Sequence, residues 1–134
     1  MSKPSVPTAV HVLVAEGDPD IRRMLAAAFR RWGVTGHFAG SGPQAIELYR
    51  QHAADISLVL LEVALPEADG PAVLAAIRTI CPGPRCWFVG GTDGEYTRQQ
   101  LLDRGADGLL PKPFDLKSLR RIVESAGDSG RAGG

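Results

Sequence analysis

The chain has 134 residues, of which 44% are hydrophobic and 22% are charged, values typical of one soluble globular domain that can bury a core. Its 15 basic residues balance its 15 acidic ones, which excludes a strong electrostatic attraction to nucleic acid or to an anionic membrane. No apolar run approaches the roughly 20 residues of a membrane span and the first residues contain no apolar signal segment, so we predict a cytoplasmic protein.

The first predicted strand, Val10–Ala15, is a continuous apolar run apart from one histidine. A helix is predicted over Pro19–Trp32, because proline suits the first helical position, Asp18 is a candidate N-cap and Gly33 ends the pattern. Its apolar stripe comprises Ile21, Met24, Leu25, Ala28 and Trp32. The later predicted elements are the strand Val34–Ala39, a helix that opens at Ser41–Gln44 and ends at His52, the strand Ser57–Leu61, the helix Pro71–Ile80, the strand Cys86–Val89, the helix Glu95–Arg104, the strand Gly108–Leu110 and the helix Leu116–Ala126.

Five strands that alternate with five helices indicate an α/β sandwich of three layers, with a parallel sheet covered on both faces. Right-handed crossovers favour the flavodoxin-like strand order 2-1-3-4-5. The domain is expected over residues 10–126, with flexible tails at 1–9 and 127–134 that are rich in Gly, Pro and Ser. Ligands of such folds bind at the carboxyl ends of the first and third strands, which brings Glu16, Gly17, Asp18 and Glu62 together.

Three motifs in chain order make the sequence resemble a two-component response-regulator receiver domain, similar to the chemotaxis regulators. They are residues 12–23 (VLVAEGDPDIRR), the loop 65–70 (LPEADG) and residues 105–114 (GADGLLPKPF). In that family an aspartate at the end of the third strand accepts a phosphoryl group from a histidine kinase. An acid pair holds Mg²⁺ beside it, and a lysine, a hydroxyl and an aromatic side chain respond to the phosphate.

The resemblance places Glu62 at the acceptor position, so this chain carries one extra methylene there. Lys112 keeps the family's lysine and precedes Pro113, whose peptide bond is cis in the family. The acid pair falls on Glu16 and Gly17, and the second of these supplies no carboxylate.

Both positions that would respond to a phosphate have also changed. The hydroxyl position falls on Gly90, while Thr92 lies two residues further on and is expected to point elsewhere. The aromatic position falls on Leu109, which cannot act as the rotating switch. Phosphoryl transfer needs reacting atoms held roughly 3–3.5 Å apart in line, so the sequence indicates a degenerate receiver, or pseudo-receiver, that is not phosphorylated at Glu62.

Glu62 has two interpretations: a fixed ion pair with Lys112, or a permanent mimic of a phosphoaspartate with too little charge to replace it fully. Asp18 is either the helix cap or a metal ligand. Glu16 and Glu62 are close enough in the predicted fold to form a weak, optional Mg²⁺ site, and no other cofactor is expected.

We therefore expect a stand-alone receiver-like signalling domain that is not an enzyme and that acts by contact with a kinase or an output protein. One alternative is a phosphorylatable regulator that uses a displaced acid such as Asp18. Another is a flavodoxin-like nucleotide or flavin binder, which the carboxylates of residues 16–20 disfavour because they repel phosphate.

Four basic residues on the last two helices form a candidate partner or homodimer face: Arg98, Lys117, Arg120 and Arg121. In receivers the fourth helix, fifth strand and fifth helix form this face, but a solvated basic surface explains the same residues.

Cys81 and Cys86 are either two free thiols or a local redox switch, and cytosolic disulfides are uncommon. His11, His37 and His52 are scattered in the sequence, without a second ligand at a regular spacing, and are predicted to be structural.

Overall fold

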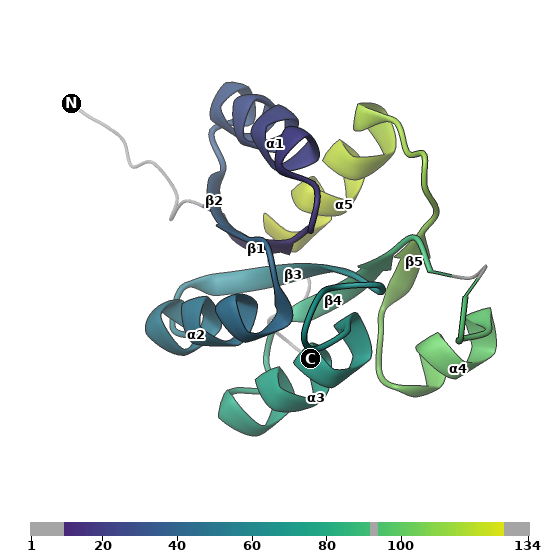
Figure 1. Cartoon of the computed structure of the whole chain (residues 1–134). Coiled ribbons are helices and arrows are strands. Elements are labelled where there is room, and N and C mark those ends of the chain that lie inside the picture. The colour runs from purple at the N-terminus through teal and green to yellow at the C-terminus, as the bar shows by residue number, and fades with distance from the viewer. Residues whose placement is uncertain (1–9, 92–93, 128–134) are drawn as a thin grey trace.

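The computed structural model describes residues 10–91 and 94–127 and shows a five-stranded parallel sheet between two layers of helices (Figure 1). In chain order the elements are β1 (His11–Ala15), α1 (Pro19–Trp32), β2 (Thr35–Ala39), α2 (Gly42–His52), β3 (Ile56–Glu62), α3 (Gly70–Ile80), β4 (Arg85–Val89), α4 (Arg98–Asp103), β5 (Gly108–Leu110) and α5 (Leu116–Gly127). The strand order is β2-β1-β3-β4-β5, which confirms the predicted flavodoxin-like topology.

Alternate residues of the central strands face opposite helix layers. Figure 1 shows α1 and α5 on one face of the sheet and α2, α3 and α4 on the other. On the α1 and α5 side the buried strand residues include Val12, Val14, Leu58 and Leu60. On the other side they include Leu13, Ala15, Val59 and Leu61. Because both faces of β1 and β3 are covered, these strands appear in the sequence as unbroken apolar runs.

The ends of α1 follow the sequence signals. The Asp18 carboxylate accepts a hydrogen bond from the Asp20 amide at the N-terminus, and Pro19 occupies the first helical turn. Gly33 ends the helix in a left-handed conformation with φ 72°. The predicted bounds of this helix are confirmed, but its stripe is partly wrong, since Met24 is 44% exposed and Phe29 is buried instead.

The predicted start of the fourth helix is wrong. Helix α4 begins at Arg98 rather than at Glu95, because Thr97 and Gln100 form a reciprocal capping box. At the other end of the chain, Gly127 is the last residue of α5 and does not belong to a tail. The predicted tail at residues 1–9, and residues 128–134 of the predicted tail at 127–134, lie outside the described residues.

The topology places the carboxyl ends of β1 and β3 next to each other, since Ala15 pairs with Leu61 in register. Glu16 follows β1 directly and Glu62 is the last residue of β3. Among the described residues, no helix is long and apolar enough to cross a membrane.

Candidate functional site

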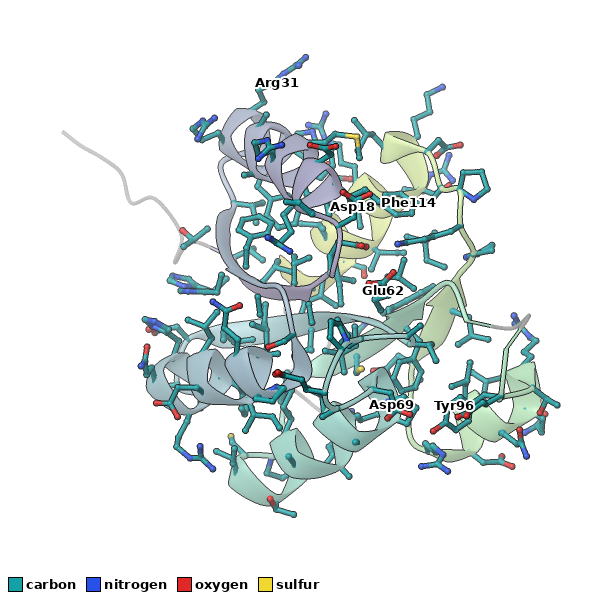
Figure 2. All side chains as sticks on the ribbon, viewed as in Figure 1. Asp18, Arg31, Glu62, Asp69, Tyr96 and Phe114 are labelled. Carbon is teal, nitrogen blue, oxygen red and sulfur yellow. The ribbon has the colours of Figure 1, made fainter. Side chains whose placement is uncertain are left out.

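Two glutamates and a lysine converge at the carboxyl edge of the sheet. The Lys112 ammonium lies 2.8 Å from Glu16 Oε1 and 2.7 Å from Glu62 Oε2. Lys112 is in the loop between β5 and α5, where its peptide bond to Pro113 is cis. Figure 2 shows Glu62 at this edge, beside the loops that carry Asp18 and Phe114.

Backbone amides occupy the two carboxylate oxygens that Lys112 leaves free. The Gly17 amide donates to Glu62 Oε1 over 2.8 Å, and the Asp18 amide donates to Glu16 Oε2 over 3.0 Å. All four carboxylate oxygens therefore have a donor within the protein. The three ionised side chains and two amides form a closed cluster, which we call the Glu-Lys-Glu cluster.

The cluster is largely shielded from solvent. The Glu16 side chain is 4% exposed, that of Glu62 18% and that of Lys112 28%. Burial raises the pKa of Glu16 and the Glu62 charge adds to that rise, while the donors from Lys112 and the Asp18 amide oppose it. Burial lowers the pKa of Lys112, but both carboxylates outweigh this effect and hold its pKa above the ordinary value.

The loop after β1 is held by the helix that follows it. Arg22 of α1 donates to the Glu16 carbonyl over 2.7 Å and to the Gly17 carbonyl over 3.2 Å. Asp18 is exposed and uses its side chain to cap α1, so it does not point into the Glu-Lys-Glu cluster. Sequence reasoning missed Arg22, although an arginine in the first turns of a helix after such a loop is placed to reach its carbonyls.

Positions 17, 90 and 109 carry no carboxylate, hydroxyl or aromatic side chain. A Cβ at Gly17 would be 3.4 Å from Glu62 Oε1, an ordinary contact. Gly90 has φ 72°, a conformation that side-chain-bearing residues rarely adopt. Leu109 is half-buried on β5 against the core. Thr92 lies outside the described residues.

The donor set fits a divalent cation poorly. Mg²⁺ prefers octahedral oxygen ligands, and the oxygens of both glutamates are already engaged by Lys112 and by amides. The Lys112 ammonium lies between the two carboxylates and contacts both. Within the described part of the chain, no group of three or more His, Cys, Asp or Glu side chains has a geometry that could hold a metal ion.

A cavity of about 450 Å³ opens beside the cluster. Its lining includes Glu62, Lys112, Gly90 and the aromatic side chain of Tyr96. The Tyr96 hydroxyl donates to Asp69 over 2.7 Å and so connects the loop before α4 to the N-terminus of α3. Sequence reasoning missed Tyr96, because residues 95–96 fit a helical pattern, which predicts them in the fourth helix instead of in the loop before it.

The four candidate partner residues do not behave alike. Arg120 pairs with Glu124 over 3.0 Å and lies 5.8 Å from the ring centroid of Trp32 on α1. Arg98, Lys117 and Arg121 are exposed, and in the described structure none has an ion pair. Arg120 therefore packs toward α1, while the other three remain candidates for a partner face.

The two cysteines are not bonded to each other. Cys81 and Cys86 are both free thiols, and Cys86 is buried.

The three histidines are scattered in the sequence but lie together in the structure. His11 and His37 are in hydrogen-bond contact over 3.0 Å, and the His37 ring stacks on His52.

Comparison with known proteins gives a consistent result. The family model for the response regulator receiver domain matches residues 12–124. The sensor kinase CckA of Brucella abortus is 33% identical over 113 residues, which are 84% of this chain and 12% of that protein. The transcriptional activator PfeR of Pseudomonas aeruginosa is 37% identical over 115 residues, which are 86% of this chain and 36% of that protein.

A similar fold occurs among solved structures. The receiver domain of a sensor histidine kinase from Pseudomonas aeruginosa, solved with a magnesium ion in its active-site cleft, matches with a TM-score of 0.77 at 22% identity. The match covers 89% of this chain and 98% of that domain. The chain thus spans the length of a receiver domain, but only a small part of relatives such as CckA and PfeR.

Proposed function

The chain belongs to the response regulator receiver family of two-component signalling, and on that premise we propose that it acts by binding a signalling protein without accepting a phosphoryl group. The observation that supports this proposal is the closed Glu-Lys-Glu cluster. Lys112 and two amides already occupy the four oxygens that would have to bind metal and attack phosphorus.

The physical requirements of phosphoryl transfer also argue against Glu62 as an acceptor. Phosphoryl transfer depends on in-line positioning and on charge neutralisation, and there is little covalent chemistry that could compensate for their loss. Glu62 directs one oxygen to the Gly17 amide and the other to Lys112. A donor molecule would have to break one of these contacts without a metal to replace it.

The structurally similar receiver domain from Pseudomonas aeruginosa was solved with a magnesium ion in its active-site cleft. In this chain Gly17 contributes no carboxylate and Lys112 contacts both remaining carboxylates and offsets one of their two charges, so we propose that Mg²⁺ is not needed and binds weakly if at all. The partner would be a protein of the same signalling system, contacted through the exposed basic residues of α4 and α5.

Incubation with a small-molecule phosphodonor and Mg²⁺, followed by intact-mass measurement, tests the proposal. A receiver that keeps the aspartate and the acid pair serves as the positive control. The expected result is no gain of a phosphoryl group. Labelling that maps to Glu62, or labelling that Asp18→Asn abolishes, would overturn it.

Two further variants separate the acceptor from its surroundings. Glu62→Asp alone is expected to remain unlabelled, because the second acid is still missing. Glu62→Asp with Gly17→Asp is expected to gain some labelling, since a Cβ at residue 17 makes only ordinary contacts. Full labelling of Glu62→Asp alone would show that the rest of the site is still competent.

The partner face can be tested by capture experiments with charge-reversal variants. Arg98→Glu and Arg121→Glu are expected to lose the captured protein. Arg31→Glu is the matched control, because Arg31 is an exposed arginine at the far end of α1 (Figure 2). Equal loss in all three variants would indicate non-specific charge attraction instead of a face.

A further inference from the structure

The three histidines of the chain lie together on β1, β2 and the end of α2. His11 begins β1 and His37 is in β2, while His52 is the last residue of α2. The strand register aligns His11 with Thr35 and Leu13 with His37, so the two strand histidines are diagonal neighbours on one face. Leu13 on that face enters the core covered by α2 and α3.

Contacts between imidazole rings connect β1, β2 and the end of α2. His11 Nδ1 and His37 Nε2 are 3.0 Å apart, a distance that requires one nitrogen to donate and the other to accept. The His37 ring also stacks on His52, with centroids 4.2 Å apart. His37 therefore connects the edge strand β2 both to β1 and to the end of α2.

Protonation of more than one of these imidazoles would destabilise the arrangement. If both His11 and His37 carried a charge, neither nitrogen could accept the hydrogen bond, and two cations would face each other. A charge on His52 would lie against the His37 ring as well. The only opposite charge that acts on His37 among the described groups is Asp55, which follows α2.

The electrostatics agree with the geometry. Burial lowers the pKa of His37 below its ordinary value, the neighbouring His52 and His11 lower it further, and Asp55 opposes them weakly. An unfolded chain would release these constraints, so it binds more protons than the native state as the pH falls below about 6.5. Stability that depends on neutral His37 is complete above that pH and is lost as the pH decreases.

We propose that His11, His37 and His52 form an acid-sensitive contact that holds the edge strand β2 against β1 and α2 near neutral pH and loosens it as the pH falls. Strand β2 is well suited to such a change, because among the described strands it is the outer one and pairs with β1 alone. The contact is separate from the Glu-Lys-Glu cluster, so it would give this domain a response that does not require a phosphoryl group.

Urea unfolding of the chain between about pH 7.5 and pH 5.5 tests the proposal, with a chelator present to exclude metal binding by the imidazoles. Each extra proton bound by the unfolded state lowers the folding constant about tenfold per pH unit. The wild-type chain should lose more of its folding constant over this range than His37→Gln, by a factor of up to about ten, the limit for one proton. Asp55→Asn should show a steeper loss than the wild type, since it removes the opposing charge.

Two readouts on the wild-type chain keep the test decisive if His37→Gln does not fold. By NMR, the His37 ring should titrate with a pKa below the ordinary value of histidine. Amide protection factors of β2 should fall at acidic pH relative to those of β5, the other edge strand. Parallel pH dependence of the wild type and His37→Gln, or equal changes in β2 and β5, would overturn the proposal.

Discussion

Replacing Lys112 by methionine is expected to destabilise the domain by about 3 kcal/mol at neutral pH. Methionine keeps the apolar stem and removes only the ammonium. Because this nitrogen lies 2.8 Å from a Glu16 oxygen and 2.7 Å from a Glu62 oxygen, the two oxygens are at most about 5.5 Å apart. Two carboxylate charges at that separation repel by about 3 kcal/mol at an effective dielectric constant near 20.

The loss should depend on pH because one of the carboxylates is buried. Burial already raises the pKa of Glu16 above 4.5, and without Lys112 an effect that lowers this pKa disappears. Between the unfolded value and the raised native value, the native state binds more protons than the unfolded chain, so stability falls as the pH increases. The Lys112→Met variant should therefore be much less impaired near pH 4.5 than near pH 7.5.

Urea unfolding followed by circular dichroism at both pH values measures this difference. Arg50→Met is the matched control, since Arg50 and Glu47 form a pair at 3.3 Å whose side chains are 59% and 58% exposed. That control should lose about 0.5 kcal/mol or less. The reasoning is refuted if Lys112→Met loses no more than Arg50→Met, or loses the same amount at both pH values.

Three further outcomes follow from the same contacts. Magnesium at about 10 mM should raise the thermal midpoint of Lys112→Met and leave the wild type unchanged, because only the variant offers two unneutralised carboxylates; equal shifts in both would contradict this. Asp18→Ala should cost about 1 kcal/mol in urea unfolding through the lost N-cap, while Asp18→Asn should cost far less, and equal losses would argue against capping. A thiol reagent should label Cys81 of the native chain much faster than Cys86, whose burial raises its pKa to about 12; equal rates would show that Cys86 is accessible.

The arrangement of strands and helices could be predicted from the sequence because apolar runs and helical stripes mark each element. The bounds of α1 are strongly specified, since a capping aspartate, a proline and a terminal glycine all agree with its periodicity. The start of α4 could not be found in this way. Its capping box at Thr97 follows residues 95–96, which fit a helical pattern equally well, so only the side-chain contacts decide between them.

The same contrast applies to the two clusters of ionisable groups. Glu16 follows β1 and Glu62 ends β3, and the carboxyl ends of these strands share one edge, so the topology predicts that the two glutamates are close. The resemblance to receiver domains predicts the pairing of Lys112 with Glu62. The histidines could not be grouped from the sequence, because the pairing of His37 with Leu13 depends on strand register. The positive φ of Gly90 could not be predicted either, because the sequence shows only that residue 90 has no hydroxyl.

Gly17 and Glu62 fit closely against each other. The longer side chain of Glu62 reaches the Gly17 amide at 2.8 Å, and a Cβ at residue 17 would already be 3.4 Å from the same oxygen. A carboxylate at residue 17 would therefore bring like charge toward Glu62. At Gly90, a serine or threonine would in addition have to adopt a backbone conformation that costs roughly 1–2 kcal/mol. A carboxylate at residue 17 would thus introduce repulsion, and a hydroxyl side chain at residue 90 would introduce backbone strain.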